Sequence, residues 1–154
     1  MKKVVKFGGS SLANAEQFQK VGKIIRAEEA RRYVVPSAPG KRFSADIKVT
    51  DMLYDCYADA VEEKDITEKL AQIKARYDEI ITGLQLDISL DTEFETIRKN
   101  FEEKAGKAYA ASRGEYLNGI VMSVYLGYTF VDAAEVIRFD EHEIFDEEAT
   151  DQLL

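Results

Sequence analysis

The chain has 154 residues, of which 45% are hydrophobic and 32% are charged, and its formal net charge is −8. This length and composition predict one soluble globular domain with a sizeable core. The negative charge argues against nucleic acid and against an anionic membrane surface as partners. No apolar run in the sequence approaches the roughly 20 residues that a membrane span needs.

The sequence holds one cysteine, Cys56, and one histidine, His142. A single cysteine cannot form an internal disulfide, which fits a reducing cytoplasm. With so few thiol and imidazole groups, a metal site built on such ligands is not expected. We therefore expect a cytoplasmic protein that binds neither membrane nor nucleic acid.

The first third of the chain predicts a strand–helix–strand unit. Residues 3–7 favour a buried strand, because Val4 and Val5 are β-branched. A helix is expected from about Asn14 to Arg31, with a capping-box spacing at its start. Residues 33–35 then predict a second buried strand. Two strands joined by a long helix are expected to pair in parallel.

The rest of the chain is predicted to be mainly helical. An exposed basic loop is expected at 41–49, and apolar residues then recur at helical spacing over about 50–62, 66–83 and 91–111. Ser112–Glu115 is expected to interrupt the chain before a helix that runs to about Leu126. Two further strands are predicted at 128–132 and 136–139, and a last helix from Asp146.

A lysine and two glycines lie at the end of the first predicted strand. Gly8 and Gly9 leave room for a ligand to approach the main chain, and Ser10 suits the start of a helix. A strand, a glycine turn and a helix start direct free backbone N–H groups at an anion, and Lys6 adds a positive charge. This stretch therefore predicts a phosphate site. It is of neither the Walker nor the G-x-G-x-x-G kind, because both motifs are absent from the sequence.

Four segments, in order along the chain, resemble motifs of the aspartokinases, a branch of the amino acid kinase superfamily. They are Lys6-Phe7-Gly8-Gly9-Ser10-Ser11, Val34 to Gly40, Lys48-Val49-Thr50-Asp51-Met52-Leu53 and Ser112-Arg113-Gly114-Glu115. The resemblance implies an α/β fold, a three-layer α/β/α sandwich with a mainly parallel sheet. It also implies ATP-dependent phosphorylation of the β-carboxylate of L-aspartate to 4-phospho-L-aspartate, the first step of lysine, threonine and methionine biosynthesis, with ATP used together with Mg²⁺.

The resemblance also implies roles for the glycine stretch. Lys6 would neutralise charge on the transferring phosphoryl group. The N–H groups around Gly8, Gly9 and Ser10 would bind the phosphoryl oxygens, where charge accumulates. A carboxylate nucleophile is already ionised at neutral pH, so no general base is needed.

The aspartate itself would be held by residues further along the chain. Thr50 and Glu115 match positions that hold aspartate in this family, and Glu115 would pair with the substrate's ammonium group. Ser37, at the end of the second predicted strand, is a weaker candidate for the same pocket.

Each of these residues also has a purely structural interpretation. Lys6 at a strand end can be a solvated lysine, and Gly8–Gly9 can be a plain turn. Ser112 and Glu115 have the spacing of a capping box, and Thr50 can be a helix N-cap.

The kinase domain of the family is about twice as long as this chain, on the scale of one large α/β domain. Residues 1–154 are therefore predicted to be its N-terminal, amino-acid-binding part, without the nucleotide-binding half and the ACT regulatory domains. Leu153 and Leu154 have little to pack against, which also indicates a truncated domain. We expect no kinase activity from the chain alone, and a homo-oligomer.

Two alternatives remain open from the sequence. One is another acyl-phosphate amino acid kinase. The other is a non-catalytic binding domain that self-associates through an exposed sheet edge.

Overall fold

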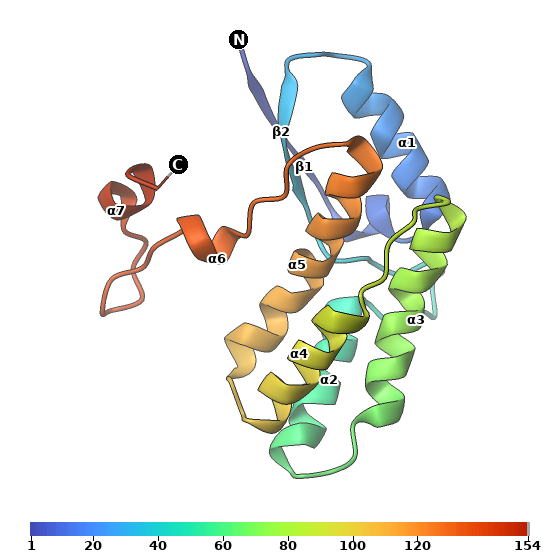
Figure 1. Ribbon diagram of the computed structural model, residues 1–154, viewed down its shortest axis with the longest axis vertical. Helices are drawn as coiled ribbons and strands as arrows, with labels where there is room; N and C mark the ends of the chain where they lie inside the picture. Colours follow the sequence, from blue (N-terminus) through green and yellow to red (C-terminus); the bar gives the residue numbers. More distant parts are fainter. Residues whose placement is uncertain (154) are drawn as a thin grey trace.

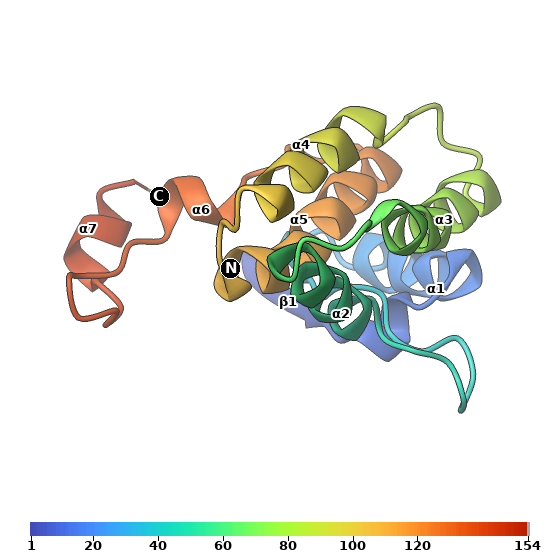
Figure 2. The same ribbon diagram turned by 90° about the horizontal axis from the view of Figure 1, so that it is seen from below.

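The fold is described by a computed structural model for residues 1–153 (Figure 1). Two strands lie beside a first helix, four further helices pack together along the molecule, and two short helices project to one side (Figures 1 and 2). The elements are β1 (Lys3–Phe7), η1 (Gly9–Leu12), α1 (Ala15–Arg26), β2 (Arg31–Pro36), α2 (Val49–Val61), α3 (Thr67–Gly83), α4 (Asp91–Glu102), α5 (Lys107–Leu126), α6 (Ala133–Val136) and α7 (Glu147–Asp151).

The strand–helix–strand unit is confirmed. β1 and β2 pair in parallel, with Val5 opposite Val34, and they form the one sheet found within residues 1–153. The side chain of Asn14 accepts a hydrogen bond of 3.0 Å from the N–H of Gln17, so Asn14 is the N-cap of α1. The helix ends earlier than predicted, at Arg26, because a turn at residues 28–31 leads into β2.

The two faces of this sheet differ. Val5, Phe7 and Val34 pack against the hydrophobic core. On the opposite face Val4 is 69% exposed and Val35 is 50% exposed. The predicted α/β fold with a parallel sheet is confirmed, but the described residues cover one face of the sheet only and so supply two of the three expected layers.

The core lies mainly among α1, α2, α3, α4 and α5. Tyr77 and Phe101 are fully buried, and each such side chain contributes about 1.5–3 kcal/mol through removal of apolar surface from water. Cys56 on α2 is also fully buried, and this burial raises the pKa of its thiol to about 11. The helices are therefore fixed by packing along their predicted apolar faces.

The helix predicted over 91–111 is wrong, because two helices occupy that stretch. The backbone enters the left-handed region at Lys104 (φ 58°) and adopts φ 110° at Gly106, which ends α4 and sets the start of α5. The N–H of Gly106 donates a hydrogen bond of 2.8 Å to the hydroxyl of Tyr57. As a result Ser112–Glu115 lies inside α5 and does not interrupt the chain.

The strands predicted at 128–132 and 136–139 do not form. The side chain of Asp132 accepts a hydrogen bond from the N–H of Ala134 and begins α6 instead. The carboxylate of Asp140 accepts from the N–H groups of His142 and Ile144, which leaves one bridge between Phe139 and Phe145.

The last predicted helix is present as α7. The prediction that the two final leucines have little to pack against includes Leu154, which lies outside the described residues. Among the helices of residues 1–153, none is long and apolar enough to cross a membrane.

Candidate functional site

The loop after β1 carries free backbone N–H groups. It turns into η1 with Gly8 at the N-cap, and no hydrogen bond from the N–H of Gly8, Gly9 or Ser10 is found within residues 1–153. Gly8 has an extended backbone (φ −78°), which any residue can adopt, and a Cβ there would meet nothing within 4 Å. Gly8 therefore borders open space, as a ligand-facing glycine should.

Gly9 has a different reason to be glycine, because it packs backbone to backbone on Gly40. The N–H of Gly40 donates a hydrogen bond of 2.8 Å to the carbonyl of Gly9. A Cβ on Gly9 would lie 2.9 Å from the carbonyl oxygen of Ala38, and one on Gly40 would lie 2.5 Å from the carbonyl carbon of Gly9. The two loops that follow the two strands are thus in direct contact.

The second of these loops, Ser37–Gly40, is held from several elements. The N–H of Ser37 donates to the carbonyl of Phe7 at 3.0 Å, and the N–H of Val49 in α2 donates to the carbonyl of Pro39 at 3.1 Å. From α5, the Nδ2 of Asn118 donates to the carbonyl of Ser37 at 2.7 Å. Ser37 is therefore a fixed part of the loop that joins β1, α2 and α5.

Glu115 reaches the same loop from the middle of α5. Its Oε1 accepts a hydrogen bond of 3.3 Å from the N–H of Ala38, and no bond to its second oxygen is found within residues 1–153. The hydroxyl of Ser112 donates to the carbonyl of Tyr109 at 2.8 Å, one turn earlier in the same helix. The capping-box interpretation is wrong, because neither residue lies at a helix start.

Close packing brings Glu115 to this place. A Cβ on Gly114 would lie 2.6 Å from the Cβ of Ala38, so only glycine lets α5 approach the loop so closely. The hydroxyl of Tyr77 donates a hydrogen bond of 2.9 Å to the carbonyl of Gly114. Burial of the ring, and secondly the charge of Glu115, raise the pKa of Tyr77, which keeps this hydroxyl a donor.

Thr50 lies in the first turn of α2. The N-cap of this helix is Lys48, so the interpretation of Thr50 as the N-cap is wrong. Thr50 is half-buried, and no hydrogen bond to its hydroxyl is found among residues 1–153. The adjacent Val49 contacts the loop at Pro39, which places the start of α2 beside Ser37–Gly40.

Lys6 and Ser10 are less closely joined to these residues. Lys6 lies on the outer face of the sheet beside Val35, is exposed, and makes no ion pair within the described chain. Ser10 is exposed in η1. The structure thus brings Gly9, Ser37, Glu115 and the first turn of α2 around one loop, and it leaves Lys6 and Ser10 facing solvent.

A groove of about 1470 Å³ opens beside Glu115. It runs between β2, α5 and the segment 127–139. Its lining includes Val35, Pro36, Arg113, Glu115, Tyr116 and Phe130. Glu115 therefore has access to a large open space on one side of the loop.

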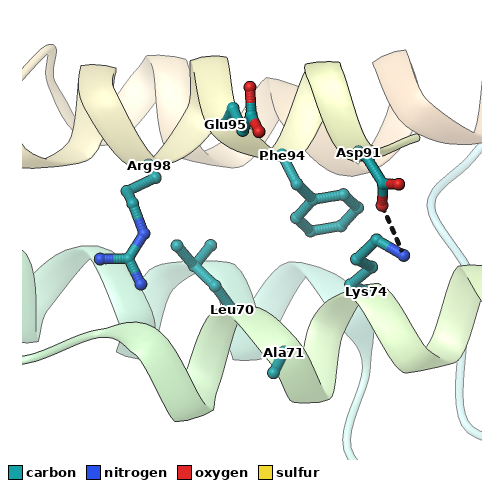
Figure 3. Close-up of a pocket in the computed structure, with 7 residues that line it drawn as sticks. All are labelled: Leu70, Ala71, Lys74, Asp91, Phe94, Glu95 and Arg98. Carbon is teal, nitrogen blue, oxygen red and sulfur yellow. Dashed lines mark ion pairs between the residues drawn. The ribbon is translucent and has the colours of Figure 1, made fainter. Parts of the chain in front are cut away.

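A second pocket, of about 330 Å³, lies between α3 and α4 (Figure 3). The Nζ of Lys74 lies 2.9 Å from Asp91 (Figure 3). Arg98 donates to Thr67 at 2.6 Å and forms an ion pair of 3.2 Å with Glu102. We assign it no functional role. Within residues 1–153 no group of three or more His, Cys, Asp or Glu side chains could hold a metal ion.

Two residues near the site were not identified from the sequence. Asn118 is fully buried, and Arg76 on α3 donates a hydrogen bond of 2.6 Å to the carbonyl of Gly40. Each occupies a position in an otherwise apolar helical stripe: Asn118 lies between Leu117 and Val121, and Arg76 lies three positions after Ile73. A polar residue within such a stripe is the signal that could have indicated them.

The loop predicted as exposed and basic is also more ordered than its composition indicates. The Nε of Arg42 lies 2.8 Å from Asp46, and another guanidinium nitrogen lies 2.9 Å from Glu79. The hydrogen bond from Arg42 holds the pKa of Asp46 well below its usual range. The charge of Arg42 is therefore neutralised internally, whereas Lys41 and Lys48 form no ion pair within residues 1–153.

Residues 1–153 match the amino acid kinase family. The chain is 38% identical over 141 residues to aspartokinase 3 of Bacillus subtilis (strain 168), which covers 87% of this chain and 31% of that protein. It is 46% identical to the solved aspartate kinase of Clostridium acetobutylicum, with a TM-score of 0.92 over 97% of this chain and 34% of the other.

A solved structure of E. coli aspartokinase III in complex with aspartate and ADP has the same fold at 20% identity. The TM-score is 0.68, and the match covers 99% of this chain and 36% of that one. The resemblance predicted from the four segments is confirmed by these relatives. The chain spans about a third of the length of the relatives it matches.

Proposed function

This chain belongs to the amino acid kinase family, and from that premise we propose that it forms the amino-acid-binding part of an aspartate kinase. The reaction transfers the γ-phosphoryl group of ATP to the β-carboxylate of L-aspartate. An O–P bond forms on the carboxylate and the bond between the γ-phosphorus and ADP breaks, which gives 4-phospho-L-aspartate and ADP. The product would enter lysine, threonine and methionine biosynthesis.

One observation carries the proposal. The loop Ser37–Gly40 contacts Gly9 on one side and the carboxylate of Glu115 on the other. Three of the four segments that resemble aspartokinases thus meet at one place, and the fourth begins α2 beside them. The E. coli relative that binds aspartate and ADP supports the assignment of both substrates.

The amino-acid side of the site is formed by Glu115, Thr50 and Ser37. Glu115 can accept a hydrogen bond from an ammonium group, because one of its carboxylate oxygens has no partner within residues 1–153. The hydroxyl of Thr50, in the first turn of α2, likewise has no hydrogen-bond partner within residues 1–153. Ser37 contributes through the loop that it anchors.

The phosphoryl side is formed by the glycine loop. The free N–H groups of Gly8, Gly9 and Ser10, and the open space at Gly8, fit an anionic phosphoryl group. ATP with Mg²⁺ would supply the phosphoryl group. Lys6 lies at the end of the same strand and would neutralise charge that spreads over the transferring oxygens. No general base is required, because the β-carboxylate is ionised at neutral pH.

The proposal assigns the nucleotide-binding half and the ACT regulatory domains to sequence outside residues 1–154. The chain alone is therefore expected to bind aspartate without phosphorylating it. A cytoplasmic location remains a prediction from the lone cysteine.

Calorimetric titration of the chain with L-aspartate tests the amino-acid side. Glu115→Gln should weaken binding by about 10- to 100-fold, the usual range for loss of a charged hydrogen bond. Glu95→Gln is the matched control, because Glu95 is an exposed glutamate on α4, away from the loop. Equal binding by wild type and Glu115→Gln would contradict the role of Glu115.

Trapping of acyl phosphate as hydroxamate tests the reaction in the longer polypeptide that carries this sequence. Turnover of aspartate supports the proposal, and turnover of another carboxylate but not aspartate favours a related acyl-phosphate kinase. Robust hydroxamate formation by the 154-residue chain alone would overturn the expectation that it is inactive.

A second candidate, a self-associating binding domain, is favoured by the exposed outer face of the sheet. Val4 and Tyr33 are 69% and 51% exposed there. Apolar surface of this kind promotes association between copies. Light scattering over a range of concentrations tests it: a homo-oligomer that neither binds aspartate nor contributes to turnover would replace the kinase proposal.

A further inference from the structure

Arg76 on α3 is a buried cation that forms hydrogen bonds with the loop beside the glycine stretch. Its side chain is 4% exposed. One guanidinium nitrogen donates a hydrogen bond of 2.6 Å to the carbonyl of Gly40, and the other donates one of 2.8 Å to the carbonyl of Ile47. The two acceptors lie at opposite ends of the loop 40–47, the teal loop that projects from the molecule in Figure 2. Arg76 therefore holds the two ends of this loop together.

The burial of Arg76 is difficult to explain by stability alone. Its charge is only partly compensated, by Asp46 at 3.4 Å, and its Nε has no hydrogen-bond partner within residues 1–153. Burying a charged group so incompletely paired costs free energy that an apolar side chain would not cost. The conformation that Arg76 imposes on the loop is the remaining explanation.

Gly40 connects Arg76 to the glycine stretch. Its carbonyl accepts from Arg76, and its N–H donates to the carbonyl of Gly9 at 2.8 Å. The carbonyl of Gly9 belongs to the same peptide group as the N–H of Ser10, so fixing one orients the other. That N–H is one of the three free donors assigned to the phosphoryl group.

We propose that Arg76 is a positioning residue, which fixes Gly40 and through it orients the Gly9–Ser10 peptide towards the phosphoryl group without touching substrate. The catalytic meaning of this inference rests on the proposed function. The structural link from Arg76 to Gly9 does not, and it can be tested on the chain itself.

Arg42 provides a matched control in the same loop. It also forms ion pairs, with Asp46 and Glu79, but none of its hydrogen bonds reaches Gly40. Arg42→Gln removes a positive charge from within the loop and Arg76→Gln removes one that contacts the loop from α3, and only Arg76→Gln removes a contact with Gly40.

Amide hydrogen exchange, followed by NMR on the 154-residue chain, tests the link. Arg76→Gln should accelerate exchange of the Gly40 N–H by about tenfold or more, as expected for loss of a charged hydrogen bond, and leave core amides such as Ile80 unchanged. Arg42→Gln should leave Gly40 unchanged. Wild-type exchange at Gly40 in Arg76→Gln, or equal acceleration in both variants, would overturn the proposal.

Arg76→Lys covers the case in which Arg76→Gln does not fold. It keeps the charge but has one nitrogen for two carbonyls, so a smaller acceleration confined to Gly40 is expected. Failure of both variants to fold would assign Arg76 to the fold as a whole and overturn the positioning role.

Kinetics of the longer polypeptide test the consequence. Arg76→Gln should lower kcat by about tenfold or more with KM for aspartate changed by less than about twofold, because Arg76 contacts none of Glu115, Thr50 and Ser37. A raised KM for aspartate with unchanged kcat would contradict the role. Lack of aspartate turnover by the wild type would instead contradict the proposed function. The exchange rate of the Gly40 N–H would then still test whether Arg76 fixes Gly40 and, through it, Gly9.

Discussion

The loops that follow β1 and β2 lie against each other but are built in opposite ways. The first has three backbone N–H groups without partners in the described chain, and it borders open space at Gly8. The second, Ser37–Gly40, is bonded to β1, α2, α3 and α5. A loop can thus keep its donors free for a ligand when a neighbouring loop supplies its rigidity.

The glycines of the two loops are of two kinds. Gly9 and Gly40 are glycines because a side chain would strike backbone, whereas Gly8 is glycine although nothing lies near it. The close contact of Gly9 with Gly40 allows the second loop to hold the first in place. Gly8 leaves open space beside the backbone for a ligand. Adding a methyl group at one kind of glycine or at the other tests whether the two loops differ in this way.

The largest effect is expected for Gly40→Ala. Its Cβ would lie 2.5 Å from the carbonyl carbon of Gly9, and backbone atoms cannot move aside cheaply. We expect a loss of about 3 kcal/mol or more in the free energy of unfolding, at the upper end of overpacking effects. Urea denaturation followed by circular dichroism measures it. A variant as stable as the wild type would mean that the loops are not in close contact.

A somewhat smaller effect is expected for Asn118→Ala. The substitution leaves the carbonyl of Ser37 without its donor and opens a small cavity in a fully buried place. The expected loss is about 2 to 3 kcal/mol by the same measurement. Ser123→Ala, on the same helix but half-buried, is the control and should cost less.

Asp46→Asn should change how stability depends on pH. Arg42 lowers the pKa of Asp46 in the folded chain, so the folded state binds its proton less readily than the unfolded state. This stabilisation is present above the unfolded value of 3.8 and is lost as the pH falls through the lower folded pKa. Asp46→Asn should be less stable at pH 7 by about 1 to 2 kcal/mol and should show a flatter acid dependence. Parallel curves for the two proteins between pH 7 and pH 2 would refute this.

The smallest effect on stability is expected for Gly8→Ala. Its Cβ would meet nothing within 4 Å, and its φ of −78° suits alanine, so the free energy of unfolding should change by less than about 0.5 kcal/mol. In the longer polypeptide kcat should nevertheless fall, because the added methyl group occupies the space assigned to the phosphoryl group. A destabilised but fully active variant would reverse the roles given to the two glycines.

Much of the fold could be predicted from local patterns. The apolar stripe from Leu70 to Ile81 was sufficient to find α3, because those side chains are the ones that it buries. The break between α4 and α5 was missed, because it depends on left-handed backbone at Lys104 and Gly106 rather than on hydrophobic periodicity. The strands expected after Gly127 were also wrong, because the side chain of Asp132 accepts from the N–H of Ala134 and begins α6 at that point.

The site could be predicted only where residue type and spacing carry the information. Gly9, Ser37 and Glu115 were named as candidates from their segments, and the structure brings them together at one loop. Asn118 and Arg76 were not found, because their partners lie 81 and 36 residues away in the sequence. Contacts of that range follow from the packed fold and leave no local pattern.

The burial of Cys56 has a practical consequence for all of these measurements. The thiolate is the form that reacts with maleimides, and in the folded chain the thiol is both inaccessible and held protonated by a pKa of about 11. Labelling at neutral pH therefore requires α2 to leave the core. Since the sequence contains a single cysteine, the rate of modification by excess maleimide reports how often this core opens, and no cysteine needs to be introduced.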